Sequence, residues 1–78
     1  MKKILIVEDD TILNKTLSYN LVSEGYETAS AYSCAMARDL LKGCFHLALL
    51  DVNLPDGSGY DYLRWIRERS QLPVLILT

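Results

Sequence analysis

The sequence ILIVEDD at residues 4–10 is an apolar run that stops on three consecutive acidic residues. Four apolar residues in a row are typical of a strand that is buried on both faces. The acidic side chains therefore follow the C-terminal end of a predicted strand, which is the edge where open α/β sheets bind their ligands. This stretch predicts both a parallel sheet and the place of its functional site.

A second apolar run, LALL at residues 47–50, also ends on an acidic residue, Asp51. If the two strands are parallel neighbours, Glu8, Asp9 and Asp51 converge on one point. Three converging carboxylates repel one another unless a cation lies between them, and oxygen ligands suit a hard divalent cation such as Mg²⁺. The pattern therefore predicts a metal-dependent acidic site.

The composition is that of one globular domain, because 50% of the 78 residues are hydrophobic and 23% are charged. The formal net charge of −2 leaves no basic stripe, so we expect no direct nucleic-acid binding by this chain. No apolar segment approaches the roughly 20 residues of a membrane span, and the N-terminus lacks the apolar core of a signal peptide. The sequence predicts a cytoplasmic protein that does not contact a membrane.

The two cysteines, Cys34 and Cys44, lack metal-ligand spacing. We expect both to be reduced and buried thiols rather than a disulfide. His46 has no histidine, cysteine or acidic residue at ligand spacing, so we expect it at the surface.

Apolar runs alternate with amphipathic segments along the whole chain. Strands are predicted at residues 3–8, 27–32, 46–51 and 74–77. Helices are predicted from the capping residue Thr11 to Gly25, from the capping residue Ser33 to Gly43, and at residues 60–69. The first helix is expected to bury a stripe of Leu13, Leu17 and Leu21. The segment 53–59 is predicted to be a turn-rich loop.

The alternation β-α-β-α-β-α-β, with three wholly apolar strands, predicts a parallel sheet with helices on both faces. Right-handed crossovers leave few strand orders, and the weakly alternating strand at 27–32 is expected at an edge. The resulting order, 2-1-3-4, is the beginning of a flavodoxin-like α/β sheet. Its switch point lies between the first and third strands, where the acidic residues are predicted to meet.

Three motifs occur in order along the chain: the apolar run with EDD at 4–10, LDVNLPDGSG at 50–59, and LPVLILT at 72–78. Together they resemble the receiver (CheY-like) domain of bacterial two-component response regulators, over essentially the whole chain. The middle motif looks most like receivers attached to winged-helix (OmpR/PhoB-like) transcription factors. The resemblance therefore implies a parent protein that binds DNA and regulates transcription.

The resemblance implies a role for each matching residue. Asp51 matches the phosphoacceptor that takes a phosphoryl group from a phosphohistidine of a sensor histidine kinase. Glu8 and Asp9 match the acidic pair that holds Mg²⁺, and Asn53 matches the residue that offers its backbone carbonyl to the same ion. Thr78 matches the hydroxyl residue that closes onto the phosphoryl group. On this basis we expect a signalling domain that is not an enzyme.

A receiver of this family continues beyond the threonine with a helix, a strand that carries an aromatic switch residue, a lysine and a last helix. Residues 1–78 are therefore expected to be the N-terminal two-thirds of a receiver domain, phosphorylated less readily than an intact one. The uncharged strand at 74–77 would then form an edge of the sheet, which favours pairing with another strand. We expect a homodimer through this strand or through the helix at 60–69.

The sequence pattern has three alternatives to an active phosphoacceptor domain. The first is an inactive receiver fragment that serves as a folding or assembly unit. The second is a fragment of a haloacid-dehalogenase-like phosphatase, which requires an acid two residues after the nucleophile, where this chain has Asn53. The third is a calcium loop starting at Asp51, which fails because Asp56 stands where the loop needs glycine.

Overall fold

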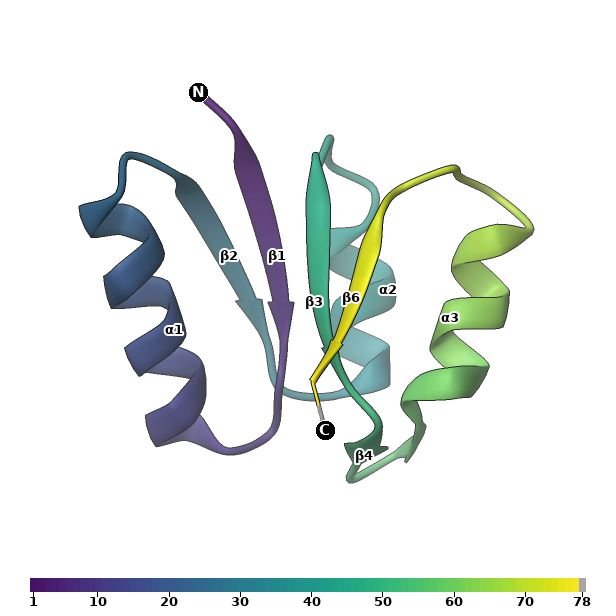
Figure 1. Ribbon diagram of the computed structural model, residues 1–78. Helices are drawn as coiled ribbons and strands as arrows, with labels where there is room; N and C mark the ends of the chain where they lie inside the picture. Colours follow the sequence, from purple (N-terminus) through teal and green to yellow (C-terminus); the bar gives the residue numbers. More distant parts are fainter. Residues whose placement is uncertain (78) are drawn as a thin grey trace.

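A computed structural model describes residues 1–77 of the chain, and Thr78 lies outside the described residues. Four parallel strands form one sheet, in the order β2 (Glu27–Ala31), β1 (Lys3–Val7), β3 (Leu47–Asp51) and β6 (Val74–Leu77) (Figure 1). This confirms the predicted flavodoxin-like order 2-1-3-4, because β6 is the fourth strand of that sheet. All four strands point their carboxyl ends toward one edge of the molecule.

Helices cover both faces of the sheet, as predicted. They are α1 (Thr11–Ser23), α2 (Cys34–Leu40) and α3 (Gly59–Arg67). Successive residues of a strand point to opposite faces, so Ile4 and Ile6 pack with α1, whereas Leu5 and Val7 pack with α2 and α3. Within the described part of the chain, no helix is long and apolar enough to cross a membrane.

The start of α1 differs from the prediction in two ways. Asp10, not Thr11, is the N-cap, because its carboxylate accepts the Leu13 N–H at 3.1 Å. The buried stripe begins at Asn14, which is fully buried, whereas Leu13 is 41% exposed. At the other end Gly25 has φ +96°, a left-handed conformation that glycine adopts without strain.

The segment predicted as a loop contains a small antiparallel ladder. Its strands are β4 (Asn53–Leu54) and β5 (Gly57–Ser58). Only Pro55 and Asp56 separate the two strands, which is the length of a tight hairpin turn. The ladder places Leu54 in the core, so the segment after β3 is fixed to the body of the domain.

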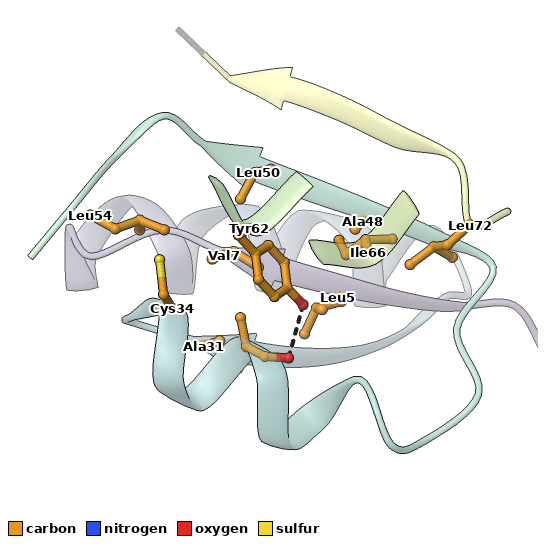
Figure 2. Packing of buried hydrophobic residues seen from close by; sticks show 11 residues of the cluster. Leu5, Val7, Ala31, Cys34, Ala48, Leu50, Leu54, Tyr62, Ile66 and Leu72 are labelled. Atoms are coloured by element: carbon orange, nitrogen blue, oxygen red, sulfur yellow. Dashed lines mark hydrogen bonds between the residues drawn. The ribbon is translucent and has the colours of Figure 1, made fainter. Parts of the chain in front are cut away.

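The larger core cluster is centred on Tyr62, one of the aromatic residues of α3 (Figure 2). Its ring is fully buried, and its hydroxyl donates to the Ala37 carbonyl of α2 at 2.9 Å. Burial raises the pKa of Tyr62, so the phenol remains a hydrogen-bond donor. This bond joins α2 to α3 across the core.

The predictions for the cysteines and the histidine are confirmed in part. Both cysteines are free thiols, and Cys34 is buried against the larger core. Cys44 is exposed, contrary to the prediction, because it lies in the turn between α2 and β3. His46 is exposed, as expected, and its Nδ1 accepts the Lys3 N–H at 3.0 Å.

Candidate functional site

The carboxyl ends of β1 and β3 bring the predicted acidic residues together. Val7 pairs with Leu50 in the sheet, so the next residue of each strand lies at the same edge (Figure 1). One carboxylate oxygen from each of Glu8, Asp9 and Asp51 lies within 4.8 Å of the others. The predicted convergence of these three side chains is therefore confirmed.

The three carboxylates differ in burial. Glu8 is only 5% exposed, Asp51 is partly buried, and Asp9 is exposed. Burial raises the pKa of Glu8 to about 7, and the carboxyls of Asp9 and Asp51 shift it in the same direction. The Asp10 N–H, which donates to Glu8 Oε2 at 3.2 Å, opposes this shift. A cation held among these oxygens would relieve the repulsion, so the donor set fits a hard divalent ion such as Mg²⁺.

A glycine lies directly against the strand end that carries Asp51. A Cβ atom at Gly59 would overlap the backbone oxygen of Asp51 and would lie 2.9 Å from Cα of Val52. The Gly59 N–H also donates to the Val52 carbonyl at 2.7 Å. The first residue of α3 therefore packs on the backbone of the acidic strand end, a contact that no pattern in the sequence indicates.

Asp56 fixes the hairpin after Asp51 to a distant helix. Its two carboxylate oxygens accept the N–H groups of Cys34, at 2.7 Å, and Ala35, at 2.9 Å. These bonds lower the pKa of Asp56. They also satisfy amide groups at the start of α2, so Asp56 acts as a cap for a helix that precedes it by 22 residues in the sequence.

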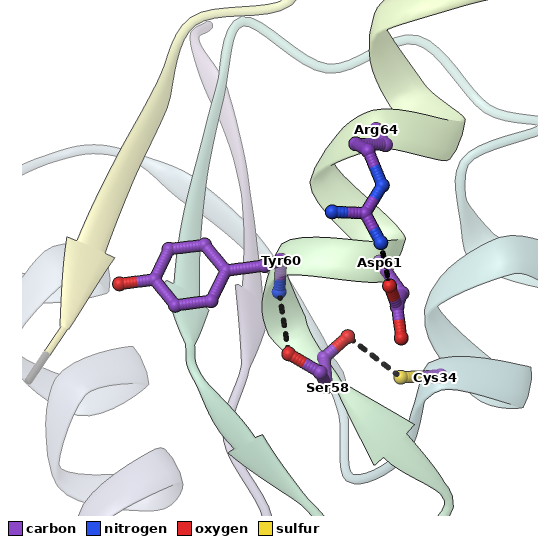
Figure 3. Close-up of polar contacts among 5 residues, drawn as sticks. All are labelled: Cys34, Ser58, Tyr60, Asp61 and Arg64. Atoms are coloured by element: carbon purple, nitrogen blue, oxygen red, sulfur yellow. Dashed lines mark hydrogen bonds and ion pairs between the residues drawn. The ribbon is translucent and has the colours of Figure 1, made fainter.

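A second set of polar contacts connects the hairpin to α3 (Figure 3). Ser58 caps α3 because its Oγ accepts the Tyr60 N–H at 3.1 Å, and its carbonyl accepts the Cys34 thiol at 4.0 Å. Within α3, Asp61 of the first turn forms an exposed ion pair with Arg64. The hairpin is thus anchored to both helices that flank it.

The role of every predicted site residue, including those of the acidic cluster, stays a prediction. Asn53 begins β4, where it pairs with Ser58, and it is exposed. Its role as a carbonyl ligand stays a prediction. The role of Thr78 also stays a prediction, because this residue lies outside the described residues.

Comparison with known proteins gives a consistent result. The sequence profile of the response regulator receiver domain matches residues 4–78. The transcriptional regulatory protein CpxR of Escherichia coli K12 is 41% identical over 78 residues, which are 100% of this chain and 34% of CpxR. BasR of the same strain is 46% identical over an alignment of 78 positions, which covers 97% of this chain and 35% of BasR. The chain thus spans about a third of the length of the curated relatives it matches.

Solved structures show the same similarity. The non-phosphorylated HemR receiver domain from Leptospira biflexa has a TM-score of 0.91 and 36% identity, covering 100% of this chain and 64% of that one. The response regulator TrrA from Thermotoga maritima, solved in complex with Mg(2+)-BeF, has a TM-score of 0.86 and 31% identity. That alignment covers 97% of this chain and 66% of TrrA.

Proposed function

Because the chain belongs to the response regulator receiver domain family, homologous to the receivers of transcriptional regulators such as CpxR, we propose that Asp51 is its phosphoacceptor. The phosphoryl group would come from a phosphohistidine of a sensor histidine kinase. The observation that supports this proposal is the convergence of Glu8, Asp9 and Asp51 within 4.8 Å at one sheet edge. Trapping the phosphoryl group on the chain and locating it is the direct test of this proposal.

The expectation that the chain is not an enzyme is corrected by this membership. Receiver domains are not enzymes in the usual sense, but they have a capacity for autophosphorylation. The chain therefore carries part of the chemistry itself, rather than serving only as a passive substrate of a kinase. A small phosphodonor is for this reason a suitable reagent for the experiments proposed below.

The reaction would use the Asp51 carboxylate as a nucleophile. One of its oxygens forms a bond to phosphorus while the bond from phosphorus to the histidine nitrogen breaks, and the electron pair returns to the imidazole. Glu8, Asp9, Asp51 and the Asn53 backbone carbonyl would hold Mg²⁺. When bound, that ion would offset the negative charge of the transferring phosphoryl oxygens. Asp51 is the last residue of β3, so the sheet fixes its backbone. Because the residue is only partly buried, a phosphodonor can reach it.

Replacement of Asp9 by alanine is expected to weaken Mg²⁺ binding more than about a hundredfold, because it removes a direct ligand from a small oxygen donor set. The measurement is a Mg²⁺ titration followed by calorimetry or by amide chemical shifts. Asp10→Asn is the matched control, since it removes the neighbouring charge but keeps the side-chain oxygen that caps α1. The Mg²⁺ affinity of Asp10→Asn should stay close to that of the wild-type chain. Saturable binding in Asp9→Ala at wild-type strength would contradict the assignment.

We further propose that residues 1–78 correspond to the N-terminal two-thirds of a receiver domain, which is supported by their coverage of 64% of the HemR receiver. The parent protein would be a DNA-binding regulator of the winged-helix class, which is in keeping with its relatives CpxR and BasR, both transcriptional regulatory proteins. Thr78 would be the switch residue that responds to phosphorylation. A cytoplasmic location and the absence of direct nucleic-acid binding by this chain remain predictions.

The chain is also expected to form a homodimer through β6 or α3. Within the described residues β6 pairs with β3 only, and Leu75 in its centre is 57% exposed. Unpaired backbone groups beside an exposed apolar side chain favour strand-to-strand association. Light scattering after size exclusion, at tens of micromolar, should report twice the chain mass, and a monomer at that concentration would reject the dimer.

A further inference from the structure

Asn14 is a fully buried amide on the face of α1 that packs against the sheet. The neighbours on that face, Leu17 and Leu21, are aliphatic and pack on the smaller core cluster. A buried polar group destabilises a core unless it is hydrogen-bonded, so the contacts of this amide require an explanation.

The Asn14 side chain extends the sheet beyond the end of β1. Its Nδ2 donates to the Glu8 carbonyl at 2.9 Å and to the Ala31 carbonyl at 3.2 Å. Ala31 also accepts the Glu8 N–H at 3.0 Å. Both backbone polar groups of Glu8 are therefore fixed, although the strand itself ends one residue earlier, at Val7.

The other end of the acidic segment is joined to the backbone of the same residue. The Asn14 backbone N–H donates to the Asp10 carbonyl at 2.9 Å, which is the first hydrogen bond of α1. One residue thus binds the segment 8–10 at Glu8 and at Asp10, while Asp9 lies between these two contacts. Glu8 and Asp9 supply two of the three converging carboxylates.

The side-chain amide of Asn14 is only partly hydrogen-bonded. Its NH₂ group donates two hydrogen bonds, whereas its Oδ1 is buried without a hydrogen-bond partner. An apolar side chain of similar size, such as leucine, would avoid the unpaired Oδ1 but would leave the buried Glu8 carbonyl without its donor. The unpaired Oδ1 therefore lowers the stability of the fold, whereas the two bonds from Nδ2 fix the backbone of the acidic segment.

We propose that Asn14 is a positioning residue, which holds the segment 8–10 in the conformation that lets Glu8 and Asp9 share a cation with Asp51. This inference rests on the proposed Mg²⁺ site. Carboxylates within 4.8 Å of one another repel, and a segment that carries two of them would otherwise move away from the third. Groups that orient metal ligands without touching the metal commonly change metal affinity 10–100-fold.

The test is Mg²⁺ affinity in Asn14→Leu and Asn14→Ala, measured by calorimetry on proteins shown by circular dichroism to be folded. We expect affinity to fall about tenfold or more in either variant. In the metal-free proteins the amide resonances of residues 8–10 should shift. Ser18→Ala is the matched control, because the Ser18 hydroxyl also joins α1 to β2, through Thr28 at 2.6 Å, but does not contact the acidic segment. It should lower stability and leave Mg²⁺ affinity unchanged.

A purely structural role for Asn14 would give a different result. The Asn14 variants and Ser18→Ala would then lose thermal stability while binding Mg²⁺ like the wild-type chain, and that outcome would overturn the proposal. If Asn14→Leu does not fold, Asn14→Ala gives the same decision. Failure of the wild-type chain to bind Mg²⁺ would instead refute the proposed metal site, and with it the role assigned to Asn14.

Discussion

The Asp51→Asn variant is expected to take up no phosphoryl group from acetyl phosphate and Mg²⁺, whereas the wild-type chain gains one phosphoryl mass. The amide keeps the size of the side chain but removes its negative charge, and its nitrogen electron pair is delocalised, so the nucleophile is lost. Intact-mass spectrometry, with a time course after addition of the donor, measures the effect. This is the largest change that the proposed function predicts for a single residue.

Two controls make this result specific. Asp10→Asn changes an adjacent acid that is not one of the three converging carboxylates, so it should be phosphorylated like the wild-type chain. Circular dichroism should show that Asp51→Asn remains folded. Undiminished labelling of Asp51→Asn would mean that another side chain accepts the phosphoryl group.

The Gly59→Ala variant is expected to lose about 2–3 kcal/mol of folding free energy, and phosphorylation with it. The added Cβ would overlap the Asp51 backbone oxygen and approach Cα of Val52 to 2.9 Å. Both neighbours are backbone atoms, which cannot rotate away like the end of a side chain. Either α3 or the end of β3 has to move, and Asp51 moves with the latter. Urea unfolding measures the stability, and intact mass after acetyl phosphate measures the labelling.

Gly43→Ala is the matched control for this substitution. A Cβ at Gly43 would meet the Leu40 carbonyl oxygen at 3.4 Å and the Phe45 ring at 3.7 Å, which are ordinary contact distances. The alanine should be neutral or slightly stabilising, because it restricts the unfolded chain. Equal stabilities for the Gly43 and Gly59 variants would show that the close packing of α3 on Asp51 does not constrain the protein.

The sheet and its acidic edge could be predicted because their signals are local. The two central strands, β1 and β3, each contain a continuous apolar run that is followed by an acidic residue. Because the strands are parallel, these acidic residues lie at the same edge of the sheet. Once the strand order follows from handedness, the convergence of Glu8, Asp9 and Asp51 needs no further information. The structure confirms this part of the prediction in detail.

The sequence does not indicate the contacts that a side chain makes with residues far away along the chain. Helical periodicity favours Leu13 for the buried stripe, but Asn14 is buried there instead, because its amide binds the carbonyls of Glu8, just after β1, and of Ala31, at the end of β2. Asp56 lies in a turn, as predicted, but no local pattern indicates that it caps α2, which precedes it in the sequence. The contact of Gly59 with Asp51 depends on where α3 begins, and a glycine in a turn gives no sign of it. Such contacts follow from tertiary packing, which outweighs local preference.

The central claim is that the phosphoryl group resides on Asp51, and chemical trapping tests it most directly. The chain is incubated with acetyl phosphate and Mg²⁺, the acyl phosphate is reduced with borohydride, and the peptides are sequenced by mass spectrometry. Reduction converts a phosphorylated aspartate into homoserine, so the modified position is identified without a mutation. We expect homoserine at position 51 alone. Reduction products at Glu8, Asp9 or Asp10 instead, or no reduction product at all, would contradict the account.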